Sequence, residues 1–128
     1  KNYKDVEFGY VKFVYRVEAT DNTNYIELDK AKEAFAKINE LRKAQGLKEL
    51  TWSDDVYNSR ALPKAHTISR QYDSTGFVAR REDNATTVAT KWYNSGLREL
   101  MLDPNATEGA VAVVINGDGN YYWAFMYK

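Results

Sequence analysis

The stretch that decides the fold runs from residue 39 to residue 65 and reads NELRKAQGLKELTWSDDVYNSRALPKA. Its first part closes an amphipathic helix, because the apolar residues between Ala31 and Leu41 recur at intervals of three and four. Gly46 is expected to end that helix, since the position after a helix often takes a positive φ that glycine adopts without strain. Ser53 is then expected to cap a second helix whose first turn carries two aspartates.

Two further features of these helices are predicted. Asp29 is expected to cap the first helix by accepting an unpaired backbone N–H. Pro63 lies inside the second helix, where proline removes a backbone hydrogen bond and its ring clashes with the preceding turn. We therefore expect a kink or break near Leu62 and a second helical piece that begins at Pro63, because proline is tolerated at the first helical position.

The C-terminal segment predicts a β-hairpin. Residues 110–115 (AVAVVI) form a strongly apolar run, and residues 121–127 (YYWAFMY) alternate between two faces. The turn-forming run Asn-Gly-Asp-Gly-Asn at 116–120 separates them. In the second strand, one face would carry Tyr122, Ala124 and Met126, and the other Tyr121, Trp123, Phe125 and Tyr127.

The segments outside these two units complete the predicted order of elements. Residues 6–17 alternate and predict a strand, whereas residues 69–85 are polar and aperiodic and predict a long loop. A third helix, capped by Asn84 or Thr86, should end at Gly96, followed by a short helical turn over 97–102. Strands flanking a helical middle indicate an α+β fold in which helices cover an antiparallel sheet.

One domain is expected over residues 1–128, with a strand extension over 1–28 and a core over 29–128. The chain has 18 Lys and Arg against 18 Asp and Glu, so it lacks the one-sided basic field that a nucleic-acid binder needs. It contains no cysteine and one histidine, which excludes disulfides and thiolate metal sites. No apolar run approaches the roughly 20 residues that span a bilayer.

Five residues stand in the order N-x-x-R-x-x-x-G-x-x-x-L-x-W, namely Asn39, Arg42, Gly46, Leu50 and Trp52. The run Trp-Tyr-Asn-Ser at 92–95 and the apolar hairpin continue the order downstream. This arrangement resembles the CAP superfamily, which contains cysteine-rich secretory proteins, antigen 5, plant pathogenesis-related proteins and many bacterial secreted or surface domains. The resemblance covers roughly residues 30–128.

The resemblance implies a three-layer α-β-α sandwich with a central antiparallel sheet. Because the chain is cysteine-free, it resembles the bacterial members, which implies a secreted or cell-surface location. Many members hold two His and two Glu in a central cleft able to bind zinc. Carried over to this chain, Thr67 replaces a glutamate, Ser74 and Leu97 replace the two histidines, and Glu82 remains. With His66, these residues are the cleft candidates.

The sequence offers few residues that could carry out catalysis. His66 and Glu82 supply at most half a zinc site, and His66 is better explained as a surface or helix-end histidine. No serine lies in a nucleophile-elbow context, so we predict no catalytic residue, no metal and no cofactor. Five tyrosines are candidates for a binding face or are partly buried packing residues: Tyr72, Tyr93, Tyr121, Tyr122 and Tyr127.

The predicted function is therefore a non-catalytic, monomeric CAP-like domain that binds a protein, glycan or lipid, and not nucleic acid. One alternative is a hydrolase with a rearranged site around His66 and Glu82. Another is a binder of a small apolar ligand such as a sterol or fatty acid, held by the turn at 97–102 and the terminal aromatic residues.

Overall fold

The computed structural model describes residues 24–128, so the strand predicted over residues 6–17 lies outside the described residues. The elements follow in the order β1 (Tyr25–Ile26), α1 (Leu28–Ala44), β2 (Thr51–Trp52), α2 (Asp54–Val56), the π-helix η1 (Tyr57–Ala61), α3 (Leu62–Arg70), β3 (Val78–Arg80), α4 (Ala85–Tyr93), α5 (Arg98–Met101), β4 (Glu108–Ile115) and β5 (Tyr121–Tyr127).

The sheet is built on the C-terminal hairpin, which forms as predicted. β4 and β5 are antiparallel, with Ile115 opposite Tyr121 beside the turn and Gly109 opposite Tyr127 at the far end. β3 pairs antiparallel with the outer edge of β5. The other edge of β4 is shared by two short strands, since β1 pairs antiparallel with one end and β2 pairs parallel with the other.

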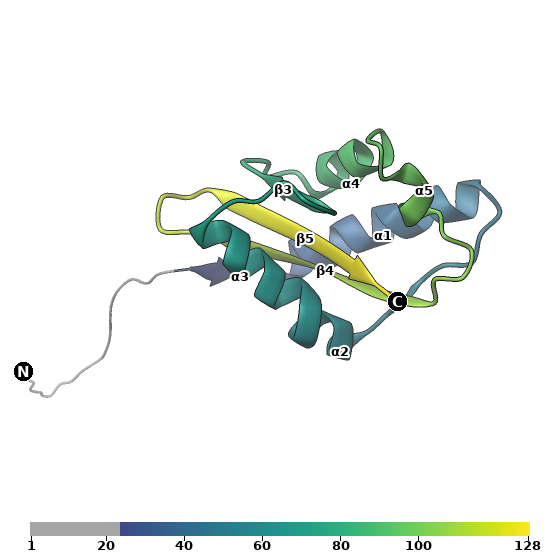
Figure 1. Cartoon of the computed structure of the whole chain (residues 1–128), viewed down its shortest axis with the longest axis horizontal. Coiled ribbons are helices and arrows are strands. Elements are labelled where there is room, and N and C mark those ends of the chain that lie inside the picture. The colour runs from purple at the N-terminus through teal and green to yellow at the C-terminus, as the bar shows by residue number, and fades with distance from the viewer. Residues whose placement is uncertain (1–23) are drawn as a thin grey trace, which may run out of the picture.

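Helices cover both faces of this sheet, which confirms the α-β-α sandwich. Figure 1 shows α3 in front of the sheet and α1 behind it. Alternate residues of β4 face opposite layers, so Val111 and Val113 pack in the core with α1 and α4, whereas Ala110, Ala112 and Val114 pack against η1 and α3. The two faces of β5 alternate as predicted, with Trp123 and Phe125 on the α1 side and Ala124 on the α3 side.

The two faces of the sheet differ in the size of their side chains. The α1 side is filled by large rings, including Phe35, Trp92 and Phe125. The α3 side is lined by alanines of the sheet and by Ala61 and Ala65 of the helical layer. Because small side chains on both partners leave little space between the layers, the second layer packs closely on the sheet.

Helix α1 starts earlier than predicted and ends as predicted. Its cap is Glu27, which makes no side-chain capping bond, and Asp29 lies in the first turn. The start is set by β1, because the Glu27 N–H still donates to the Val113 carbonyl at 3.4 Å. At the other end Gly46 has a φ of 77°, and the Gly46 and Leu47 N–H groups donate to the Lys43 and Arg42 carbonyls.

Pro63 does not break the second helix. Ser53 caps α2 as predicted, since its Oγ accepts the Val56 N–H at 3.1 Å. The chain then widens into η1, where the Leu62 N–H donates to the Tyr57 carbonyl five residues earlier, and α3 begins at Leu62. The changed hydrogen-bond register lets a residue without an N–H enter the first turn of α3. The irregularity predicted near Leu62 is therefore a π-helix rather than a break, and the second helical piece begins at Leu62, one residue before Pro63.

Two boundaries after α3 differ from the prediction. The predicted loop over 69–85 contains β3, an edge strand of three residues that is too short to show an alternating pattern. Helix α4 is capped by Asn84, whose Oδ1 accepts the Thr87 N–H at 2.9 Å, but it ends at Tyr93 rather than Gly96. Gly96 lies in the turn before α5, which forms within the predicted helical stretch.

A buried asparagine joins α1 to the segment that leads into the second helical layer. Asn39 is 8% exposed, and its Nδ2 donates to the Leu50 carbonyl at 3.0 Å. In return the Leu50 N–H donates to Asn39 Oδ1 at 2.7 Å. Both backbone groups of a buried residue outside regular secondary structure are thereby satisfied.

A buried arginine of the same helix holds two further segments. Arg42 is 1% exposed, and its Nε donates to the Lys48 carbonyl at 2.9 Å. Its Nη1 donates to the carbonyls of Met101 and Asp103 at 2.8 and 3.0 Å. Burial lowers the pKa of Arg42, while the nearby Asp103 carboxylate raises it. We refer to Asn39, Arg42 and these backbone partners as the α1 junction.

Replacing Asn39 by leucine tests the α1 junction. The Asn39→Leu variant keeps the side-chain size but leaves the Leu50 N–H and carbonyl unpaired in a buried place, so it should lose about 2–4 kcal/mol of unfolding free energy. Urea denaturation measures the loss. The exposed Asn58 is the matched control, and Asn58→Leu should change stability by less than about 0.5 kcal/mol. Equal effects in the two variants would contradict the role assigned to Asn39.

Candidate functional site

Two adjoining clefts lie where the end of α3 and its following loop meet β3 and α4. The first has a volume of about 510 Å³ and is lined by Thr67, Gln71, Tyr72, Asp73 and Ser74. The second has a volume of about 310 Å³ and is lined by Tyr72, Val78, Ala79, Arg80, Lys91, Trp92 and Ser95. Tyr72 is common to both, so we name the pair the Tyr72 groove.

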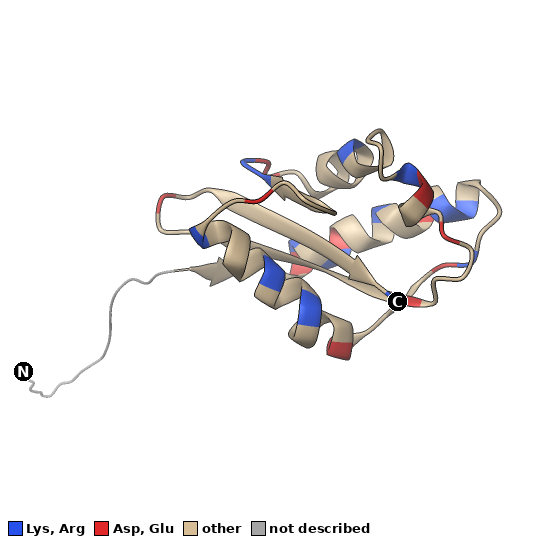
Figure 2. Ribbon diagram, viewed as in Figure 1, with Lys and Arg blue, Asp and Glu red and all other residues tan. Residues whose placement is uncertain are grey.

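Charged side chains of both signs line the Tyr72 groove. The Arg80 guanidinium lies over the Tyr72 ring, 4.2 Å from its centroid. Asp73 accepts the Thr75 hydroxyl at 2.7 Å and the Thr75 N–H at 2.9 Å, and these hydrogen bonds hold the pKa of Asp73 below its ordinary value. Figure 2 shows basic and acidic residues interspersed along α1, whereas α3 and α4 carry basic residues alone.

The walls of the groove are held by the core beneath it. Trp92 is buried, and its indole Nε1 donates to the Val78 carbonyl at 3.1 Å, which ties α4 to β3. Ser95 Oγ donates to the Trp92 carbonyl at 2.6 Å and accepts the Leu97 N–H at 3.1 Å. The groove is therefore shaped by contacts between α4, β3 and the turn after α4.

Two of the predicted cleft residues lie in the Tyr72 groove. Thr67 lies on α3 and Ser74 in the loop after it, and both line the first cleft. The Thr67 hydroxyl donates to the Pro63 carbonyl at 2.9 Å. Where the family resemblance implies a glutamate and a histidine, this cleft thus presents two neutral hydroxyl groups.

The other three candidates are not among the lining residues of the groove. Glu82 is half-buried, its Oε1 lies 3.6 Å from Lys91 Nζ, and its Oε2 accepts the Asn84 N–H at 3.3 Å. Leu97 packs against the core of the α1 side. His66 is half-buried on α3. Burial, followed by the nearby Arg70, lowers the pKa of His66.

The residues do not fit the zinc site that the resemblance implies. Within residues 24–128, no three or more His, Asp or Glu side chains group closely enough to hold a metal ion. Zinc in proteins requires about four nitrogen, sulfur or carboxylate ligands in a tetrahedral arrangement. Glu82 is engaged by Lys91, and Leu97 offers no donor atom, so we assign no step of chemistry to a metal.

Sequence reasoning found part of this groove. Tyr72 stands among the tyrosines predicted as candidates for a binding face. Arg80 and Lys91 were not predicted as groove residues. For Arg80 the reason is that residues 69–85 were predicted as a loop without β3, so nothing placed Arg80 beside the end of α3. The usable signal would have been the short Val-Ala-Arg run at 78–80 that follows the turn-forming Gly76.

Residues 35–127 match the family model described as the cysteine-rich secretory protein family, CAP. The chain belongs to the CAP family. A solved structure similar to this CAP domain is that of a cysteine-rich secretory protein from Staphylococcus aureus subsp. aureus Mu50, with a TM-score of 0.52 and 19% sequence identity. The match covers 78% of this chain and 38% of the staphylococcal protein, so the CAP domain spans less than half of that protein.

At that identity the staphylococcal structure supports the shared fold alone. The search among curated proteins found no match to this CAP domain. None of the helices within residues 24–128 has the length and apolar character needed to cross a membrane.

This CAP domain has one histidine, so the titration of His66 can be followed without overlap from a second imidazole and tests the surroundings of α3. His66 should titrate below its ordinary value of 6.5, because burial and Arg70 disfavour the charged imidazolium. The unfolded chain then binds the proton more readily, so stability should fall as the pH drops from 6.5 toward the lower folded-state pKa. NMR titration of the imidazole and urea denaturation across this range measure both effects.

The His66→Asn variant is the control for this titration. It should remove the part of the pH dependence that lies between 6.5 and the folded-state pKa of His66. An imidazole that titrates at or above its ordinary value would contradict the structure around α3.

Proposed function

We propose that this CAP domain is a non-catalytic binding domain of a secreted or cell-surface bacterial protein, and that the Tyr72 groove recognises its ligand. The proposal is supported by a groove lined by the hydroxyl-bearing Thr67 and Ser74, the positions at which the family resemblance implies a glutamate and a histidine. A groove whose lining holds one carboxylate, Asp73, and no histidine is suited to recognition rather than to turnover.

Two of the hydroxyl groups beside the groove are poorly placed for nucleophilic catalysis. Thr67 and Ser95 donate their hydroxyl protons to backbone carbonyls, so neither is hydrogen-bonded to a base. A serine or threonine nucleophile needs an adjacent general base, and the one histidine is not among the groove residues. These contacts support the binding proposal over the alternative of a hydrolase built around His66 and Glu82.

The groove also has features that suit a polar ligand. The Arg80 guanidinium is held in place by its stacking on Tyr72, so binding would cost less side-chain freedom than for a free arginine. Gln71, Asp73 and Ser74 add hydrogen-bonding groups in the adjoining first cleft. A peptide or a glycan provides partners for all of these groups, whereas a fatty acid or sterol, with one polar end, would leave most of them unpaired.

Zinc titration tests the non-metal part of the proposal. Excess zinc should leave the melting temperature unchanged, because only a ligand that binds the folded state stabilises it. The Thr67→Glu/Ser74→His double variant adds a carboxylate and an imidazole beside Asp73, so any zinc-dependent rise should be larger there than in the unmodified protein. A zinc-dependent rise in the unmodified protein would overturn this part of the proposal.

Arrays of bacterial surface glycans and of peptides test the binding part. The labelled protein should bind members of one class, and Tyr72→Ala and Arg80→Ala should each weaken that binding by about tenfold or more. Arg60→Ala, which removes an exposed arginine of η1 outside the groove, should leave it unchanged. Full binding by Tyr72→Ala, or no binding to either array, would count against the proposal.

A further inference from the structure

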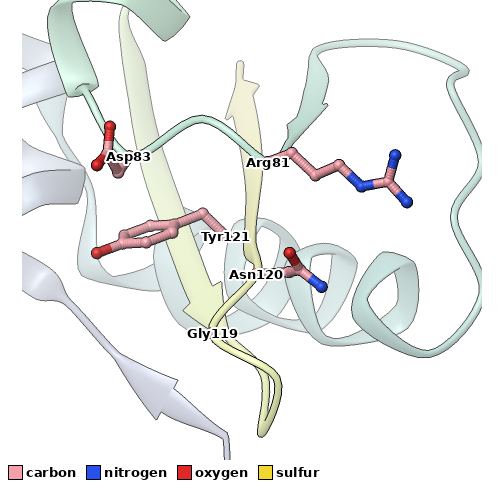
Figure 3. Close-up of a pocket in the computed structure, with 5 residues that line it drawn as sticks. All are labelled: Arg81, Asp83, Gly119, Asn120 and Tyr121. Carbon is pink, nitrogen blue, oxygen red and sulfur yellow. The ribbon is translucent and has the colours of Figure 1, made fainter.

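A separate cleft lies at the other end of β3, and it shares no residue with the Tyr72 groove. Its volume is about 340 Å³, and it lies between the loop that joins β3 to α4 and the β4–β5 turn (Figure 3). It is lined by Arg81, Asp83, Gly119, Asn120 and Tyr121. We name it the Arg81 cleft.

The backbone at Arg81 adopts a conformation that an arginine does not favour. Arg81 has a φ of 63° and is the one non-glycine residue within residues 24–128 with a positive φ. Glycine adopts this conformation freely, whereas a residue with a Cβ does so at a cost. An arginine at such a position is unfavourable for local structure, and outliers of this kind cluster at functional sites.

The strained conformation is held in place by its neighbours. The Arg81 N–H donates to the Tyr121 carbonyl at 2.8 Å, which extends the β3–β5 pairing by one residue. The indole of the buried Trp123 donates to the Glu82 carbonyl at 2.6 Å, and Lys30 Nζ donates to the Asp83 carbonyl at 3.0 Å. Three successive residues are thus anchored through their backbones, and the side chains of the first and third, Arg81 and Asp83, line the cleft.

The side chains of the cleft separate into two chemical groups. Figure 3 shows the Arg81 guanidinium and the Asn120 amide extending to one side, and the Asp83 carboxylate and the Tyr121 hydroxyl on the other. Within residues 24–128, Arg81 takes part in no ion pair. The Tyr121 ring is stacked beside Trp123, with ring centroids 6.5 Å apart, and Lys30 Nζ lies 5.8 Å from its centroid.

We propose that the Arg81 cleft is a second ligand site, which binds a sugar or polyol that carries an acidic group. The Arg81 guanidinium receives the acidic group, since its planar fork suits a carboxylate or a phosphate, and the Asn120 amide donates an additional hydrogen bond. Asp83 accepts hydrogen bonds from ligand hydroxyls, and Tyr121 can donate or accept. The strained backbone at residue 81 directs the guanidinium to this position.

Titrations with D-glucuronate and with glycerol 1-phosphate, followed by NMR, test the proposal and separate its two possible anions. At least one probe should cause saturable shifts of the Arg81, Asn120 and Tyr121 amides, and D-glucose and glycerol should cause none at the same concentrations. Arg81→Lys keeps the charge but loses the fork, so it should bind at least several-fold more weakly. The absence of saturable shifts with both acidic probes would overturn the proposal.

The Arg81→Gly variant separates a ligand site from a purely structural arginine. Because glycine takes a positive φ without strain, the variant should melt at or above the temperature of the unmodified protein, yet it should lose binding of the acidic probe. Binding that survives in Arg81→Gly would contradict the proposal. Tyr72→Ala should bind the acidic probe normally, so failure at the Tyr72 groove and failure at the Arg81 cleft are distinguishable.

Discussion

The fold depends on hydrogen bonds to buried backbone groups in the link between α1 and β2. This link forms no helix or strand. Leu50 is 3% exposed, and its N–H and carbonyl are satisfied by one side chain, Asn39. Arg42, one helical turn further on, satisfies three more carbonyls, at Lys48, Met101 and Asp103. Helix α1 thereby positions both the entry into β2 and α2 and the approach to β4. A charge-bearing side chain is tolerated in this place because it makes three hydrogen bonds to carbonyls and lies near the Asp103 carboxylate.

The position of the Tyr72 groove follows from this arrangement. Once the link from α1 is anchored, β2 pairs with the start of β4, and the second helical layer must cross the alanine-lined face of the sheet. The π-turn in η1 keeps that layer helical past Pro63, so α3 reaches far enough to bring Thr67 and the following loop beside β3. Trp92 closes the other side by its bond to the Val78 carbonyl. The walls of the groove are thus held by core packing and by the side-chain bonds of Trp92 and Ser95, whereas exposed lining residues such as Ser74 take no part in holding them.

Features encoded by local physics could be predicted from the sequence, and features that depend on distant partners could not. The Gly46 stop, the Ser53 cap and the two faces of β5 follow from φ preferences, capping and alternation, and each forms. The start of α1 could not be predicted from Asp29, because β1 pairs with β4 across most of the chain and sets the boundary. β3 could not be predicted for a similar reason, since its three residues form a strand only because they pair with β5. The Arg81 cleft could not be predicted from the sequence, because no sequence pattern indicates a positive φ at an arginine.

Native-state hydrogen exchange at the Leu50 amide is the most direct measurement of the central claim. Leu50 lies outside the helices and strands, so an ordinary link would exchange through local opening at a low free-energy cost. If the α1 junction holds the architecture together, the Leu50 amide should exchange only through global unfolding, with the same opening free energy as the slowest amides of β4. Exchange at Leu50 through a local opening of much lower free energy than that of β4 would contradict the account.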